Sequence, residues 1–285
     1  MTGNLVMSLD KYRWFIESDE DYLVLNEGEY TVRKFLREIA RPDWVFVDVG
    51  AHVGEYAVRL ARYYMKVIAI EPNPRAVAKL VKNIKLNNIN NIEVIQVACG
   101  DVETEMMLRV RGGSSTLLPD IKSDTVVKVK VTRLDNIVEH ADVIKIDVEG
   151  FEEKVILGAM KLIEKCRPIL VIEHHEERGY QQCAGMRERI KKHLRGYIAF
   201  NLDFVHWAYV PEGDRLEHVL KTCPDVICWH WFNHCIKMLV EKNCWYYGLP
   251  ETWWYGAHII DFYEALKEHI KHESIWLEKI KKGEV

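Results

Sequence analysis

The chain has 285 residues, of which 48% are hydrophobic and 29% are charged. This composition excludes fibrous and disordered proteins and predicts a soluble globular protein with one main domain and extensions. The formal net charge of −4 argues against a general attraction to nucleic acid or anionic lipid, although it is compatible with a local basic patch.

The sequence also predicts the cellular compartment. Its N-terminus does not combine a basic start with an apolar run, and no stretch approaches the ~18 uncharged apolar residues of a membrane span. The seven cysteines, an odd number in a chain of this length, fit reduced thiols better than a disulfide framework. We therefore expect a cytoplasmic protein without a membrane span.

Residues 1–42 predict an N-terminal extension that contains helix and strand. Aromatic and charged residues alternate at its start, and a helical pattern follows at Val32, Phe35, Leu36 and Ile39. Pro42 ends this pattern because proline excludes helical geometry from the residue before it.

Residues 43–211 repeat a unit in which a short apolar run is followed by a turn and a helical pattern. This alternation predicts an α/β domain with a Rossmann-like, mostly parallel sheet. The expected strands span residues 45–49, 67–70, 92–98, 143–148 and 169–173, and the expected helices span residues 55–64, 74–86, 151–165 and 186–194. The second helix has a clear start, since Asn73 can cap it and Pro74 suits its first turn.

Three further segments complete the predicted organisation. A polar insert precedes the fourth strand and contains an exposed strand at 126–131, while patterns at 197–200 and 205–210 predict an antiparallel edge to the sheet. Residues 212–285 predict a helical extension rich in tryptophan and cysteine. Its final amphipathic helix, at 259–280, suits packing on the main domain or a homodimer contact.

The C-terminal extension carries two groups with an open interpretation. Cys223, Cys228, His230, His234 and Cys235 lie close together, but their spacing matches no common zinc site and favours buried structural residues. Five tryptophans between positions 229 and 254 could stack on sugars or nucleobases, although core or interface packing is the simpler role.

The first expected strand leads into a turn that suits a nucleoside cofactor. Gly50 and Gly54 allow close approach of the backbone to a ligand, and the helix that follows presents free N–H groups. Glu71 stands about twenty residues further on, where an acidic side chain accepts hydrogen bonds from ribose in nucleotide-binding sheets. Asp48, directly before the turn, strengthens this interpretation. The turn lacks the close glycine pair that admits a pyrophosphate, which favours a donor with one nucleoside and an amino-acid tail.

Five motifs occur in a fixed order between residues 27 and 211: DVGAHVGEY, IEPNP, LNN, TRLDNIV and KIDVEGFE. Together they resemble the FkbM-type methyltransferase family, which implies a class I methyltransferase fold that uses S-adenosylmethionine. The resemblance also implies that Gly50, His52 and Gly54 border the methionine part of the donor and that Glu71 binds its ribose. The segment 96–101, including Asp101, would lie against the adenine. His52 departs from the asparagine common at its position in the family.

The fourth and fifth strands end in polar side chains, and ligands of such sheets lie outside the carboxyl ends of the strands. The catalytic candidates are therefore Asp147, Glu149, Glu173 and His175. Lys145 shares a strand face with Asp147, and the two either brace the site or take part in the chemistry.

The role of each candidate can be ranked by its chemistry. His175 would be the natural proton acceptor because the unperturbed histidine pKa lies near neutrality. The alternative interpretation, a solvated histidine at a strand end, fits the sequence nearly as well. The carboxylates would hold sugar hydroxyls. The same groups could bind a divalent ion, but we do not expect an obligatory metal. Asp135 is expected to cap a short helix at 136–139.

The resemblance implies O-methylation of a hydroxyl on a sugar, glycan or glycolipid-type acceptor. One alternative is an RNA or protein methyltransferase that uses the aromatic C-terminal extension for recognition, although the acidic composition counts against nucleic acid. Another is a regulatory protein that binds S-adenosylmethionine without catalysis, which the intact acidic groups argue against.

Overall fold

The computed structural model describes residues 4–17, 21, 29–111, 114–123, 125–175, 183–203, 205–227 and 229–230. All of them belong to one compact unit that spans Met1–His230. The expected helix at 259–280, its homodimer contact and most of the tryptophan and Cys/His groups lie outside the described residues.

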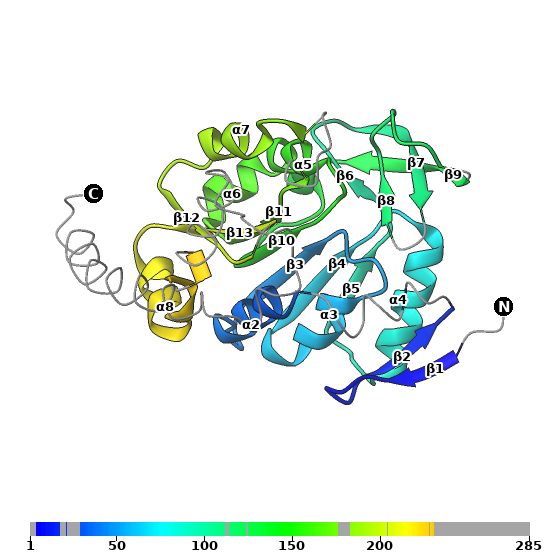
Figure 1. The fold of residues 1–285 in the computed structure, drawn as a ribbon, viewed down its shortest axis with the longest axis horizontal. Helices are drawn as coiled ribbons and strands as arrows, with labels where there is room; N and C mark the ends of the chain where they lie inside the picture. The colour runs from blue at the N-terminus through cyan, green and yellow to red at the C-terminus, as the bar shows by residue number, and fades with distance from the viewer. Residues whose placement is uncertain are drawn as a thin grey trace, which may run out of the picture. The chain divides into compact units, whose positions relative to one another are not determined.

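A seven-stranded sheet forms the centre of this unit, in the order β12-β13-β11-β10-β3-β4-β5 (Figure 1). The strands are β3 (Val45–Val49), β4 (Lys66–Ile70), β5 (Ile92–Ile95), β10 (Val143–Ile146), β11 (Ile169–Glu173), β12 (Tyr197–Asn201) and β13 (His206–Pro211). The five strands from β5 to β11 are parallel, and β3, β10 and β11 are buried along their whole length. Their carboxyl ends therefore meet at one edge of the sheet.

The sequence predicted that an antiparallel strand forms the edge of the sheet. In the structure, the antiparallel strand lies one position inside the edge. β13 pairs antiparallel with both β11 and β12, so β12 is the edge strand and runs in the same direction as β11. Burial explains the order, because β13 buries Ala208, Tyr209 and Val210 while the first three residues of β12 stay partly exposed. The more apolar strand takes the inner position.

Helices cover both faces of the sheet (Figure 1). α2 (Tyr30–Glu38), α3 (Glu55–Leu60) and α4 (Pro74–Leu86) lie on one side, and α5 (Glu152–Gly158), α6 (Met160–Cys166) and α7 (Met186–His193) lie on the other. The unit also contains α8 (Asp214–Thr222) and the 3₁₀ turns η1 (Ala61–Tyr63) and η2 (Leu134–Asn136). α4 begins as expected, with the Asn73 side chain accepting a hydrogen bond from the backbone N–H of Arg75 at 3.0 Å.

The helix expected at 151–165 is divided in two at Ala159, whose backbone leaves helical geometry. A Cβ at Gly158 would lie 1.8 Å from the carbonyl oxygen of Gly100, so the chain passes too close here for any side chain. Asp135 accepts a hydrogen bond from the backbone N–H of Leu162 at 2.9 Å and so caps α6. The expected helix at 136–139, with Asp135 as its cap, is wrong.

A second sheet is inserted between β5 and β10. It contains β6 (Ala98–Cys99), β7 (Thr104–Arg111), β8 (Ser114–Thr116) and β9 (Thr125–Thr132) in the order β6-β9-β7-β8. β9 confirms the strand expected at 126–131. The strand expected at 92–98 is too long, because the chain leaves the main sheet after Ile95 and Ala98 pairs with Val131 of β9.

A short hairpin of β1 (Asn4–Met7) and β2 (Arg13–Ile16) precedes the domain. β2 lies against α4, where the backbone N–H groups of Arg13 and Phe15 donate to the side chains of Asn87 and Asn83 at 2.9 and 2.7 Å. In the part of the chain that the structure describes, no helix combines the length and apolar character needed to cross a membrane.

Candidate active site

The loop after β3 packs directly against the segment after β10. The backbone N–H groups of Gly50 and Ala51 both donate to the carbonyl oxygen of Ile70, at 2.9 and 3.0 Å. Gly50 has a φ of +88°, and a Cβ on it would lie 1.8 Å from the carbonyl oxygen of Asp147. Only glycine therefore fits this position. The contact joins the predicted donor loop to the predicted acceptor site.

Glu71, at the end of β4, ties the glycine loop to the start of α4. Its Oε2 accepts from the backbone N–H of His52 at 2.9 Å, and its Oε1 accepts from the backbone N–H of Asn73 at 2.8 Å. Burial raises the pKa of Glu71 to about 7, although both N–H groups oppose this shift. A carboxylate has about four lone-pair positions, so two remain for ribose hydroxyls. The site therefore fits the predicted ribose contact.

Asp48 is fully buried within β3. Its Oδ2 accepts from the backbone N–H of Ala57 in α3 at 3.2 Å, while its Oδ1 has no hydrogen-bond partner among the described residues. Burial raises the pKa of Asp48 to about 6, and the nearby ammonium of Lys145 opposes this shift. Asp48 therefore supports the first turn of α3 from inside the sheet.

Asp101 lies just after β6, in the inserted sheet. Its Oδ2 is 2.8 Å from Nζ of Lys154 in α5, and its carbonyl oxygen accepts from the guanidinium of Arg133 at 2.8 Å. Arg133 also donates to Asp135 and to the carbonyl oxygen of Leu157. The RLD motif is thus a structural junction, and the side-chain hydrogen bond of Asp101 goes to α5.

Lys145 and Asp147 form a buried ion pair at the end of β10, with Nζ 3.1 Å from Oδ2. Burial alone would lower the pKa of Lys145, but the surrounding carboxylates raise it well above its usual value. Burial would raise the pKa of Asp147, but Lys145 and a hydrogen bond with Glu173 hold it far below its usual value. Nζ of Lys145 also lies 4.4 Å from the ring centroid of Tyr56. Both partners therefore stay charged.

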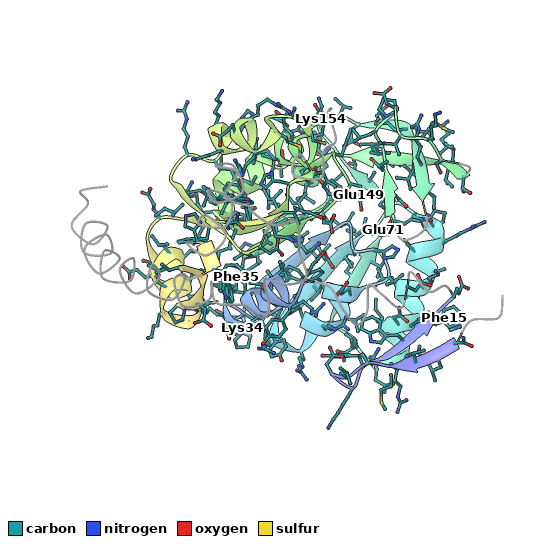
Figure 2. All side chains as sticks on the ribbon, in the orientation of Figure 1. Phe15, Lys34, Phe35, Glu71, Glu149 and Lys154 are labelled. Atoms are coloured by element: carbon teal, nitrogen blue, oxygen red, sulfur yellow. The ribbon has the colours of Figure 1, made fainter. Side chains whose placement is uncertain are left out.

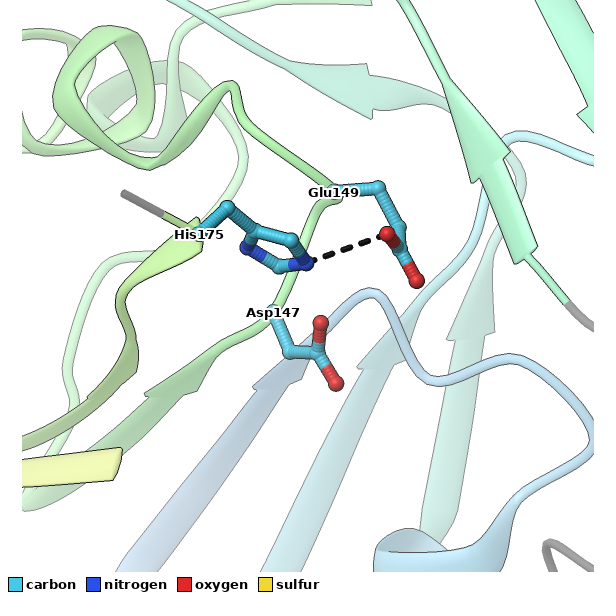
Figure 3. Close-up of side chains that lie close together, drawn as sticks. All are labelled: Asp147, Glu149 and His175. Atoms are coloured by element: carbon cyan, nitrogen blue, oxygen red, sulfur yellow. Dashed lines mark ion pairs between the residues drawn. The ribbon is translucent and has the colours of Figure 1, made fainter. Parts of the chain in front are cut away.

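His175, directly beyond β11, lies between the carboxylates of Glu149 and Glu152, and Figure 3 shows its ion pair with Glu149. Its Nε2 is 3.0 Å from Oε2 of Glu149, and its Nδ1 is 3.0 Å from Oε1 of Glu152. Burial would lower the pKa of His175, but Glu149 and Glu152 raise it to about 12. The near-neutral pKa that suggested a proton acceptor is therefore wrong, as is the alternative of a solvated histidine, because the ring is completely buried.

Exposure separates the four catalytic candidates into two pairs. The side chains of Asp147 and Glu149 are 23% and 20% exposed, whereas those of Glu173 and His175 are buried. Figure 2 labels Glu149 together with Glu71 at this edge of the sheet. Asp147 and Glu149 can therefore touch an acceptor, and the buried pair can act only by positioning them.

The backbone around Glu149 is strained in a way that aims its side chain. Glu149 has a φ of +54° and Gly150 a φ of +101°, and the first of these is uncommon for a residue with a side chain. The hydroxyl of Thr116 in β8 donates to the carbonyl oxygen of Glu149 at 2.7 Å. The neighbouring sheet therefore helps to hold this turn.

A family model described as the methyltransferase FkbM domain matches residues 48–205. The chain belongs to this family. Among curated relatives, it is 35% identical over 95 residues to the tRNA(Phe) (4-demethylwyosine(37)-C(7)) aminocarboxypropyltransferase of Methanocaldococcus jannaschii. This match covers 33% of this chain and 38% of that protein. It is 26% identical over 172 residues to the hexuronic acid methyltransferase AglP of Haloferax volcanii, which covers 57% of this chain and 70% of that protein.

A solved structure of an FkbM methyltransferase from Methylobacillus flagellatus aligns with 59% of this chain and 44% of its own, at 19% identity and a TM-score of 0.44. The chain thus spans well under half the length of the M. jannaschii relative and of this structure.

Sequence analysis did not identify one residue of this site, Glu152. Oε1 of the buried Glu152 accepts from the backbone N–H groups of Val148 and Gly150, at 3.2 and 3.0 Å, in addition to its contact with His175. Its position in the first turn of a helix, directly after a strand end with candidate acids, was the available signal. Glu152 holds the turn after β10 and His175 together.

A cation could reach three side chains of the FkbM domain. Asp147, Glu149 and His175 offer ligand atoms that all lie within 4.8 Å of one another. A metal ligand must be a neutral imidazole, yet His175 is held protonated, and the ammonium of Lys145 already neutralises Asp147. Two cations of the protein itself, Lys145 and His175, thus already lie among these carboxylates.

Proposed function

We propose that this protein is an S-adenosylmethionine-dependent methyltransferase that O-methylates a hydroxyl of a sugar, glycan or glycolipid-type acceptor. The close approach of Gly50 to the carbonyl oxygen of Asp147 carries the proposal, because the glycine loop then lies beside the half-buried acids Asp147 and Glu149. Membership of the FkbM family supports methyl transfer, and the hexuronic acid methyltransferase supports a sugar acceptor.

When bound, S-adenosylmethionine supplies an electrophilic methyl group. In the proposed donor site, Gly50, His52 and Gly54 border the methionine part, and the N-terminus of α3 faces its carboxylate. Glu71 accepts hydrogen bonds from the ribose hydroxyls. The segment ending at Asp101 lies on the adenine side, and Asp48 supports the loop by holding Ala57.

Asp147 and Glu149 are the proposed acceptor-binding residues. Each carboxylate accepts hydrogen bonds from hydroxyls of the acceptor, which aligns one oxygen with the methyl group. Glu149 takes the proton of that hydroxyl as the new C–O bond forms and the C–S bond of the donor breaks. His175 orients Glu149 through its ion pair, while Lys145 and Glu173 lower the pKa of Asp147 and so keep it ionised.

We further propose that the reaction needs no divalent metal, because Lys145 and His175 already supply positive charge beside the reacting carboxylates. Activity that survives complete chelation would support this part of the proposal, whereas activity that is lost and then restored by magnesium would refute it. A cytoplasmic location also stays a prediction.

The first test is donor binding by calorimetry, followed by a panel of acceptors that contains uronic acids, neutral glycans and tRNA. Mass spectrometry of the products identifies the transferred group. Addition of one methyl group to a sugar supports the proposal. Absence of donor binding would refute it.

The M. jannaschii relative favours RNA modification as a second candidate, because that protein acts on a tRNA and is 35% identical to this chain over 95 residues. Modification of tRNA, together with binding that weakens steeply as salt increases, would identify this alternative. Donor binding without turnover on any acceptor would instead identify a regulatory protein.

A further inference from the structure

One pocket of this acidic protein is strongly basic. It is lined by residues of α2, of α3 and η1, and of the turn between β1 and β2, and its volume is about 370 Å³. That volume lies within the range of ligand pockets. Five cations and one acid line it: Arg33, Lys34, Arg37, Arg59, Arg62 and Asp10. None of these residues belongs to the candidate active site.

Three of the five cations are neutralised by carboxylates. Arg33 pairs with Glu55, Arg59 pairs with Asp10, and Lys34 pairs with carboxylates of α2 and of the segment after α8. These ion pairs fix the walls of the pocket, but they do not provide net positive charge.

The other two cations, Arg37 and Arg62, form no ion pair with any residue that the structure describes, and both are exposed. The guanidinium of Arg62 lies 4.7 Å from the ring centroid of Tyr63 and donates to its hydroxyl at 2.6 Å. A guanidinium held in this way still has N–H donors for an anion, and planar donors match the oxygens of a phosphate. The pocket therefore offers two uncompensated charges.

We refer to three exposed apolar side chains of the β1–β2 hairpin, whose turn lines the pocket, as the apolar rim. Leu5 and Met7 of β1 are 64% and 69% exposed, and Leu9, which lines the pocket, is 97% exposed. Leu5 and Met7 share one face of the strand because side chains alternate along it. β2 is anchored to α4, so β1 is the outer strand of the hairpin (Figure 1).

We propose that this pocket binds the phosphate headgroup of an anionic phospholipid, while Leu5, Met7 and Leu9 enter the interfacial layer of the membrane. Basic residues beside exposed apolar side chains are the combination that binds a protein to an anionic lipid surface. RNA would leave the three apolar side chains in water, whereas a lipid surface would cover them. The proposal does not depend on the reaction that the domain catalyses.

The test is co-sedimentation of the full chain with vesicles of phosphatidylcholine, with or without phosphatidylglycerol. The wild type is expected to bind only the vesicles that contain phosphatidylglycerol. Reversing two charges with Arg37→Glu and Arg62→Glu should weaken this binding by about tenfold or more. The matched control, Lys191→Glu with Lys192→Glu on α7, should keep wild-type affinity.

A second pair of variants tests the apolar rim. Leu9→Asp should weaken vesicle binding, whereas Val126→Asp, at an exposed apolar position of the inserted sheet, should not. Thermal unfolding establishes that each variant is folded. Equal binding to both vesicle types, or no effect of the Arg37 and Arg62 substitutions, would overturn the proposal.

Two further measurements distinguish the source of the phosphate. Calorimetry with inorganic phosphate and glycerol phosphate, and a filter-binding assay with tRNA, use the same variants. Binding of a soluble phosphate or of tRNA that depends on Arg62, together with no binding of vesicles, would also overturn the lipid assignment.

Discussion

His175 joins two glutamates, with Nε2 3.0 Å from Glu149 and Nδ1 3.0 Å from Glu152. The imidazolium therefore links the end of β11 to the turn after β10 and to the first turn of α5. Because both nitrogens are engaged, the ring cannot rotate without losing two contacts. The residue that sequence reasoning favoured as the base is thus a positively charged clamp between two carboxylates, and we propose Glu149 as the base in its place.

The clamp predicts how stability depends on pH. The pKa of His175 is raised in the folded protein to about 12 from 6.5, so its stabilisation is complete below pH 6.5 and is lost as the pH rises through the folded pKa. Above neutral pH the free energy of unfolding should fall by up to about 1.4 kcal/mol per pH unit. His175→Gln should remove this slope in urea unfolding, whereas His193→Gln on the exposed end of α7 should keep it. Equal slopes in wild type and His175→Gln would contradict the clamp.

Glu149→Gln should lower kcat by about 10²–10⁴-fold, because the amide cannot take the proton of the acceptor hydroxyl. Donor binding should stay unchanged, since Glu149 lies outside the glycine loop. Steady-state kinetics and calorimetry measure the two effects separately. The control is Glu188→Gln, an exposed position in α7. An unaltered kcat in Glu149→Gln would require another base.

Glu71→Gln should weaken S-adenosylmethionine binding by about 1–3 kcal/mol, because the loop would lose a charged acceptor for ribose hydroxyls. Burial raises the pKa of Glu71 to about 7, so donor affinity in the wild type should also fall as the pH is lowered through 7. Calorimetry at several pH values measures both effects. Glu93→Gln on β5, whose side chain is exposed, is the control. Wild-type affinity in Glu71→Gln would show that the ribose lies elsewhere.

Gly50→Ala should destabilise the protein more than Gly213→Ala. Both glycines have a φ near +90°, but a Cβ on Gly213 meets nothing within 4 Å, whereas one on Gly50 meets the carbonyl oxygen of Asp147. Both substitutions place a side chain at a positive φ, so each also carries a backbone cost. The remaining steric cost should be about 1–3 kcal/mol in denaturant unfolding. Equal destabilisation by both substitutions would mean that the loop moves away from Asp147 at little cost.

The sequence predicted the elements whose pattern is local. The apolar runs of β3, β10 and β11 are buried on both faces, and each lies where it was expected. Asn73 and Pro74 located the start of α4 to the residue. These features depend on neighbouring residues alone, so a single sequence was sufficient to find them.

The errors arose where a distant contact decides the structure. Gly158 ends α5 because Gly100 approaches it, and Ile95 ends β5 because Ala98 pairs with β9. The protonation of His175 depends on Glu149 and Glu152, which lie more than twenty residues before it in the chain. Neither the approach of two backbones nor the sum of nearby charges is visible in a local pattern.

The inserted sheet begins and ends at one place, because Ala98 of β6 pairs with Val131 of β9. Between these ends, Ser115 accepts a hydrogen bond from Asn73 beside the donor loop, and Thr116 donates to the carbonyl oxygen of Glu149. A segment whose two ends are adjacent can be exchanged between homologous domains as one unit. Exchange of residues 104–132, whose ends also meet because Thr104 pairs with Val131, would thus change the sheet that contacts Asn73 and Glu149, while the segment from Gly50 to Asp101 would be inherited intact. Substrate range and cofactor use in this fold can therefore diverge separately.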